Sequence, residues 1–352
     1  MEKINIDRKK LVKENEIEIK QDLIVPDTKQ DIFQIKDQSF YCYLSKIEVL
    51  NGKVKINGNI DSYIAYLSSG ETTSVLQTTL NFTDTIEDDL ILENMNVKYD
   101  TEIQKQEIKV VNERKISISI VLKIAYEIYG IDEVELLDDF SDIEDIQISS
   151  QKININSVVG QGVGFASLKE DLKIESTDIV SDIMKVKTEI QNKEVKISHN
   201  KVLAKADLFV EIEYLTQDER VGQKQEKLPI MSFIDIPNVG EKNSCTTDYQ
   251  VRSIILSFNQ NEENAITIQM EYEIICKAFE NREQTIVSDL YSLKYDLEFD
   301  SKEIEITDGT EGNNKTIKVV QNVRKKEELL DNNYSIVVYT VKKNEIGRAS
   351  CR

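Results

Sequence analysis

A stretch of alternating side chains, residues 53–66 (KVKINGNIDSYIAY), limits most strongly what this chain can fold into. From Val54 to Tyr66 its even positions are apolar or small, and its odd positions are mostly polar. A period of two residues is typical of a β-strand with one buried face, whereas an amphipathic helix has a period of 3.6. At roughly 3.3 Å per residue this strand would be about 45 Å long. We therefore expect it to bend, at Gly58.

The same pattern returns 148 positions later, at residues 201–214 (KVLAKADLFVEIEY), with the same face apolar. Five other landmarks return in the same order, 148 to 151 positions apart, so the chain is predicted to contain two copies of one β-rich domain. The landmarks are KINI at 3–6 and 152–155, KQDL at 20–23 with KEDL at 169–172, Asp31-Ile32-Phe33 with Asp182-Ile183-Met184, Phe82 with Phe233, and the alternating stretches 116–126 and 266–276.

These patterns predict a mainly β protein with two repeated antiparallel β-sandwich-like domains and a β-rich C-terminal segment. The expected parts are a first domain at 1–131, an acidic linker at 132–150, a second domain at 151–281, and a β segment with a polar linker at 282–333. The side chains predicted to fill the first core are Val54, Ile56, Ile60, Ile64, Ile118, Ile120 and Leu122; those of the second are Val202, Leu208, Val210, Ile212, Ile268 and Met270.

Composition narrows the choice of partners. The chain has 64 acidic and 44 basic residues, a net charge of -20, which disfavours nucleic acid and anionic membranes. We find no signal peptide and no apolar run of about 18 residues. The cysteines (Cys42, Cys245, Cys276 and Cys351) lie far apart and form no metal or disulfide motif. A cytoplasmic location without membrane insertion is expected.

No catalytic, metal or cofactor site is predicted. The single histidine, His199, cannot form a histidine-based metal cluster, and it is interpreted as a turn residue. Residues 131–145 (IDEVELLDDFSDIED) hold eight acids and no base, but they lack the frame of a calcium loop and are interpreted as a solvated linker. The glycines of VVGQGVGF (158–165) do not fit a phosphate-binding loop and predict a flexible turn between strands. Carboxylates are so numerous that the sequence neither supports nor excludes a glycosidase-type acid pair.

Several segments resemble a known family. QDLIVPDTKQDIFQI (21–35), the strand at 51–66 and the Phe-centred motifs LNFTDTI and IMSFIDI resemble the SPOCS domain of spore-coat proteins, over about residues 14–300. SDLYSLKYDLEF (288–299) resembles the segment that follows SPOCS repeats in that family. SIVVYTVKKNE (335–345) resembles the first strand of a LysM domain, although Asn344 and Glu345 replace the usual Gly and Asp.

The resemblance implies a structural, non-enzymatic scaffold of spore coat assembly that acts in the mother cell at the forespore surface. It implies a protein partner, the sporulation ATPase of the coat basement layer, bound through the LysM domain. The residues of this chain that match the LysM start are Tyr339, Val341, Lys342, Asn344 and Glu345. The alternative is a peptidoglycan- or carbohydrate-binding LysM protein of the cell envelope, because LysM domains elsewhere bind N-acetylglucosamine glycans.

The last residues do not continue the LysM pattern. Residues 334–345 are expected to be the start of a truncated LysM domain. Residues 346–352 (IGRASCR) equal the translation of a common short-read sequencing adapter, so they are expected to be an artefact rather than protein. On this hypothesis the chain would bind the ATPase weakly or not at all.

Overall fold

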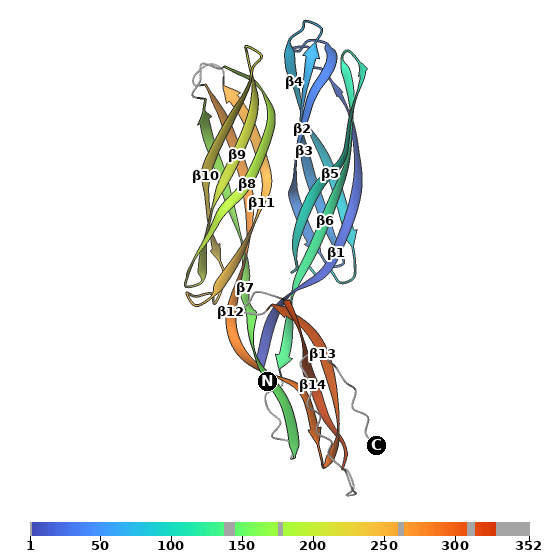
Figure 1. Ribbon diagram of the computed structural model, residues 1–352, viewed down its shortest axis with the longest axis vertical. Coiled ribbons are helices and arrows are strands. Elements are labelled where there is room, and N and C mark those ends of the chain that lie inside the picture. Colours follow the sequence, from blue (N-terminus) through green and yellow to red (C-terminus); the bar gives the residue numbers. More distant parts are fainter. Residues whose placement is uncertain (1, 137–144, 175–178, 260–263, 308–313, 329–352) are drawn as a thin grey trace, which may run out of the picture.

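The computed structural model of the protein describes residues 2–136, 145–174, 179–259, 264–307 and 314–328 (Figure 1). Every element in these residues is a β-strand, and all strand pairs are antiparallel. The predicted mainly β fold is confirmed. No helix in the described part of the chain could cross a lipid bilayer.

Two three-stranded sheets face each other in the first half of the chain and enclose one apolar core. One sheet has the order β1-β6-β5 and the other has the order β2-β3-β4. The alternating stretches 53–66 and 116–126 lie in β3 and β6, which are the central strands of the two sheets. Each central strand pairs with a neighbour on both sides. The strands are β1 (Glu2–Ile24), β2 (Ile32–Leu50), β3 (Lys53–Ser68), β4 (Thr73–Glu87), β5 (Asn96–Asn112) and β6 (Lys115–Leu136).

The second half repeats this arrangement, with sheets β11-β12-β7 and β10-β9-β8. Strands β2 to β5 recur as β8 to β11 at a separation of 148 positions. The irregularities recur as well: the register shift between Tyr43 and Lys46 in β2 matches the one between Gln191 and Glu194 in β8. The strands are β7 (Ile146–Lys173), β8 (Val180–Ser198), β9 (Lys201–Thr216), β10 (Val221–Asp235), β11 (Ser244–Asn259) and β12 (Ala265–Ser292).

The predicted core residues of both halves are buried, as the alternation required. Each set lies in one continuous apolar cluster. The second cluster also takes in Tyr63, Ala65 and Val75 from the first sandwich, so apolar packing continues across the boundary between the two sandwiches. Figure 1 shows the two sandwiches lying side by side along their length.

Gly58 makes room for an aromatic ring. It pairs with Phe82 across β3 and β4, and a Cβ on Gly58 would lie 2.1 Å from the Phe82 ring. In the second repeat the positions 148 residues later hold Ala206 and Ile230, also a register pair. The repeat with the larger side chain on the outer strand of the pair, Phe82, therefore has the smaller residue on the central strand, Gly58. A register shift in β2, between Tyr43 and Lys46, lies opposite Gly58.

The pairing of Phe82 with Phe233 as repeat landmarks is wrong. Phe82 is buried, whereas Phe233 is 68% exposed on the outer face of β10. Their separation of 151 positions exceeds by three the separation of 148 positions that relates the strands of the two repeats. Three is an odd number, and an odd shift moves a strand residue to the opposite face.

The glycines of VVGQGVGF lie inside strand β7, so the predicted flexible turn is wrong as well. A Cβ on Gly162 would lie 2.7 Å from the backbone oxygen of Asp235, and one on Gly164 would lie 2.7 Å from Ile234. Strand β7 borders one sheet and β10 borders the other. The glycines thus let two sheet edges approach closely and close one side of the second sandwich.

A third, smaller core joins both repeats to a C-terminal hairpin of β13 (Tyr295–Thr307) and β14 (Asn314–Glu328). Both ends of the expected acidic linker are strand, since β6 continues to Leu136 and β7 begins at Ile146; residues 137–144 lie outside the described residues. The hairpin lies at the end of the sandwiches where the N-terminus is found (Figure 1). The third core contains Ile4, Ile6, Val134 and Leu136 from the first repeat, Ile155 and Ile286 from the second, and Ile304, Ile306, Ile317 and Val319 from the hairpin.

The acidic strand end beside this core is held by basic partners. Asp132 pairs with Lys10 and with Arg8, the latter at 3.2 Å. Burial raises the pKa of the Asp132 carboxyl, but the hydrogen bonds and charges of its two partners lower it by more, so the net shift is downward. Part of the predicted solvated acidic linker is therefore an ion-paired strand.

Candidate functional site

The residues matched to the LysM start, Tyr339 to Glu345, lie outside the described residues, so the structure does not place them. His199 is exposed in the two-residue turn between β8 and β9, so its interpretation as a turn residue is confirmed. The residues that the structure describes contain no group of three or more His, Cys, Asp or Glu side chains that could hold a metal ion.

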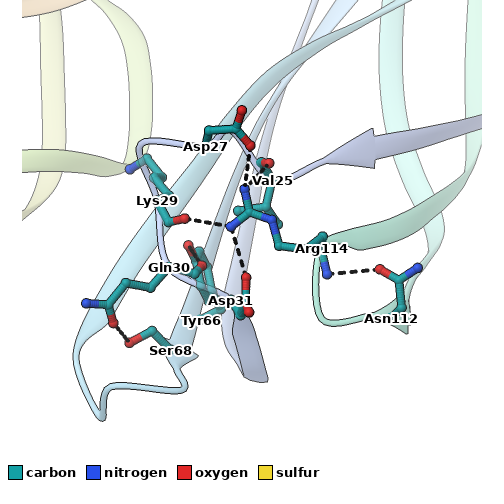
Figure 2. A network of polar contacts seen from close by, with 9 residues as sticks. All are labelled: Val25, Asp27, Lys29, Gln30, Asp31, Tyr66, Ser68, Asn112 and Arg114. Carbon is teal, nitrogen blue, oxygen red and sulfur yellow. Dashed lines mark hydrogen bonds and ion pairs between the residues drawn. The ribbon is translucent and has the colours of Figure 1, made fainter.

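A polar cluster in the first repeat organises the loop that carries the SPOCS resemblance (Figure 2). The Arg114 guanidinium donates from Nη1 to the backbone oxygen of Lys29 at 2.8 Å and to Asp31 Oδ1 at 2.9 Å. It donates from Nη2 to the backbone oxygen of Val25 at 3.0 Å and to Asp27 Oδ1 at 3.1 Å. One planar side chain thus satisfies two carbonyls and two carboxylates, which an ammonium group could not do. We call these residues the Arg114 cluster.

The sequence of the loop explains its shape. Residues 25–31 read VPDTKQD, and the Lys29 amide donates to the Pro26 carbonyl at 2.9 Å to close a tight turn. Proline and aspartate favour such turns. The next residue, Gln30, is held on both sides, because the Tyr66 hydroxyl donates to its backbone oxygen at 2.9 Å and Ser68 Oγ donates to its Oε1 at 2.7 Å.

The second repeat has no counterpart of this arginine. The Val25 amide donates to the Arg114 carbonyl in the first repeat, and the Ile174 amide donates to the Asn264 carbonyl in the second. Asn264 therefore stands where Arg114 stands. Residues 175–178, which would correspond to the VPDT turn, lie outside the described residues. The second copy reads Ile-Glu-Ser at residues 174–176, where the first reads Val-Pro-Asp at 25–27. This difference coincides with the change from arginine to asparagine.

The loop of the Arg114 cluster also contacts the second repeat. Lys29 Nζ donates to Asp182 Oδ1 at 2.7 Å, and both side chains are about three-quarters buried. Burial raises the pKa of the Asp182 carboxyl, and the Lys29 ammonium opposes this shift in part. Close by, the Thr73 amide donates to Glu219 Oε2 at 3.2 Å. The loop therefore stabilises the first repeat internally and fixes it against the second.

A second set of contacts joins the repeats near their middle. The Arg252 guanidinium donates to the Leu44 carbonyl at 2.8 Å in the first repeat and to Glu273 Oε2 at 2.7 Å in its own. The buried Gln250 side chain donates to the Val97 carbonyl at 3.2 Å. These donors satisfy backbone oxygens at edges of the first sandwich, which would otherwise be buried without partners.

A third contact lies where the sandwiches meet the third core. Lys277 is 8% exposed, and its ammonium lies 2.7 and 2.9 Å from the two carboxylate oxygens of Asp7. It also lies 5.2 Å from the centre of the Tyr129 ring. One lysine of β12 thus bridges β1 and β6 of the other repeat, at a position where neither charge has much water around it.

Beside these ion pairs, the partly buried Tyr41 hydroxyl and Cys42 thiol stay neutral near pH 7. Burial raises the pKa of the Tyr41 hydroxyl to about 12 and that of the Cys42 thiol to about 11. Cys245 is partly exposed and packs against the second core beside Cys276. Such neutral, packed groups suit an interface that holds two bodies together.

Sequence reasoning did not single out Arg114, Arg252 or Lys277. The lysine and its aspartate partner are 270 positions apart, and no periodicity relates them. For Arg114 a signal was present, since the VPDTKQD motif presents several carbonyl and carboxylate oxygens in one turn and requires a multivalent donor.

One comparison with known proteins covers part of the second repeat. Residues 179–259 match the family model described as SipL, SPOCS domain. This segment is a SPOCS domain. The match covers strands β8 to β11 of the second repeat, so the SPOCS resemblance is confirmed there. No curated protein and no solved structure matches the chain.

The first repeat shares the strand order of the SPOCS-bearing repeat and the positions of its register shifts. Strands β2 to β5 correspond to the matched strands at a separation of 148 positions. The Arg114 cluster and the three inter-repeat contacts therefore lie on a framework built from two similar units.

Proposed function

We propose that this protein is a non-catalytic scaffold of spore coat assembly that acts in the mother cell at the forespore surface. The observation that carries the proposal is the SPOCS match at residues 179–259. The rigid joining of the repeats supports a structural role, because Lys29, Arg252 and Lys277 fix the second repeat to the first at three separate places.

The protein partner proposed is the sporulation ATPase of the coat basement layer, bound through the LysM-like segment. Tyr339, Val341 and Lys342 are the residues proposed to begin that contact. The support is the likeness of residues 335–345 to a LysM start and the SPOCS domain that precedes it. The third core anchors the preceding hairpin to both repeats, so a partner bound beyond β14 would be held to the whole body.

A pull-down with the purified ATPase tests this proposal. The whole chain is immobilised beside a Tyr339→Ala/Val341→Ala variant and beside His199→Ala as a control. Residues 334–345 match only the start of a LysM domain, so the expected result is weak retention of the ATPase by the wild type and the control, with less or none in the double variant. Equal retention by all three would refute the assignment of the segment. Retention of peptidoglycan in place of the ATPase would favour the carbohydrate-binding alternative.

A further inference from the structure

A cleft of about 670 Å³ lies between the two repeats, away from the Arg114 cluster and from Lys277. Its walls come from β2 and β5 of the first repeat and from β8 and β9 of the second. Ligand-binding clefts of this size are common at boundaries between domains. We call it the inter-repeat cleft and define it by Phe40, Ile103, Val186, Glu189, Phe209 and Glu211.

The cleft exists because two sheet edges of the first sandwich end beside it. Strand β2 borders one sheet and β5 borders the other, and no further strand covers the gap between them in the described residues. Phe40 and Ile103 reach from these edges and pack only partly on the first core. On the opposite wall the half-buried Phe209 faces outward from β9. Each wall of the cleft therefore contributes apolar side chains among its polar ones.

A smaller hollow of about 340 Å³ continues from the cleft along the same strands. The two share Tyr41, Cys42 and Thr188, and the Tyr41 hydroxyl lies 2.6 Å from Thr188 Oγ1. The hollow is lined by tyrosines, including Tyr249. The buried hydroxyl of Tyr249 has no hydrogen-bond partner of good geometry among the described residues, although the Thr247 side chain lies close. A buried polar group of this kind favours a ligand that completes its hydrogen bond.

The charges of the two hollows favour a cationic ligand. The cleft holds Glu189, Glu211 and Lys187, and Lys187 is 64% exposed with its ammonium 3.9 Å from Glu211. The adjoining hollow adds Asp248. The residues that line the two hollows carry three carboxylates and one ammonium, and the Lys193 ammonium lies 5.6 Å from the centre of the Tyr249 ring. The balance is negative, in a chain whose net charge is -20. An acidic partner would be repelled and a basic one attracted.

The shape favours an extended chain. The cleft and the hollow follow one another along residues 40–43 of β2 and residues 186–190 of β8. In an extended peptide, alternate side chains face alternate sides, so apolar residues can seat in a pocket while their neighbours face its rim.

We propose that the inter-repeat cleft binds an extended, basic polypeptide segment, whose apolar side chains seat between Phe40 and Phe209 and whose basic side chains face Glu189 and Glu211. This site is independent of the LysM-like segment in the proposed function. It would give the SPOCS-bearing body a contact of its own with a second protein.

Fluorescence polarisation with a labelled peptide of alternating leucine and lysine tests the proposal. A matched peptide of alternating leucine and glutamate serves as its counterpart. The proteins are the wild type, a Glu189→Lys/Glu211→Lys variant, and a control with Glu241→Lys and Asp89→Lys, which changes two exposed acids in turns away from the cleft. The two variants carry the same net charge. Circular dichroism and thermal melting establish that each is folded.

The expected result is binding of the lysine peptide by the wild type and by the control, with affinity at least about tenfold lower in the cleft variant. Tyr249→Phe is expected to weaken binding by a few-fold. Equal loss in both variants would mean general charge attraction and would overturn the proposal. So would absence of binding to the wild type, or preference for the glutamate peptide. A dimer of the free chain that the cleft substitutions abolish, seen by analytical ultracentrifugation, would show instead that a second copy occupies the cleft.

Discussion

Removing the ammonium of Lys277 is expected to weaken the junction of the three cores. A Lys277→Met substitution keeps most of the apolar stem, but it leaves the Asp7 carboxylate, only 20% exposed, without its partner. Breaking one side of a buried ion pair typically costs about 3–5 kcal/mol, because the remaining charge is left poorly solvated. Since Asp7 keeps some contact with water, we expect the lower end, about 3 kcal/mol. That value corresponds to roughly a hundredfold change in the unfolding equilibrium constant.

Urea unfolding, followed by circular dichroism, measures this change. A Lys277→Met/Asp7→Leu double variant separates the charge from the packing, because replacing both members of a buried pair by apolar groups is often nearly neutral. The double variant should therefore recover most of the stability that the single variant loses. The matched control is Lys152→Met, since Lys152 of β7 pairs with Glu283 of β12 at 2.7 Å, but both side chains are more than half exposed.

Two results would refute this reasoning. One is a Lys277→Met variant as stable as the Lys152→Met control, which would mean that water reaches the Asp7 carboxylate easily. The other is a double variant less stable than either single variant, which would mean that packing around the pair, rather than its charge, holds the junction.

Three further changes test other parts of the structure. Gly58→Ala should destabilise the first sandwich by about 1–3 kcal/mol because the new methyl overlaps the Phe82 ring, and adding Phe82→Ile, which reproduces the second repeat's pair, should restore stability; no rescue in thermal melts would disprove the swap. Asp132 has a lowered pKa in the folded state, so its stabilisation is complete above 3.8, the usual pKa, and is lost as the pH falls further. Asp132→Asn should therefore reduce the difference between urea midpoints at about pH 6 and about pH 3, and an unchanged difference would contradict the lowered pKa. His199→Ala should shift unfolding by about 0.5 kcal/mol or less, and loss of any measured activity in this variant would overturn the expectation of a non-catalytic protein.

The alternation of residues 53–66 and 201–214 by itself determined the strands and the direction of their side chains. Facing in a strand follows from the position along the chain alone, so Val54, Ile64, Leu208 and Ile212 could be assigned to a core without knowing its other half. Because the pattern recurs along the chain, the strands of the second sandwich could also be predicted from those of the first. Where the alignment slipped by an odd number, at Phe233, the same rule reversed the facing and the prediction failed.

Only the tertiary structure decided what lies between the strands. The glycines of β7 have no local role, since they are required by the side chains of β10 more than 65 positions away. Lys277 meets Asp7 across 270 positions, and the inter-repeat cleft depends on how two finished sandwiches lie against each other. Local sequence sets the period and facing of each strand, because backbone geometry fixes them. The partners of a side chain depend on the packing of whole sheets, which many distant residues determine together.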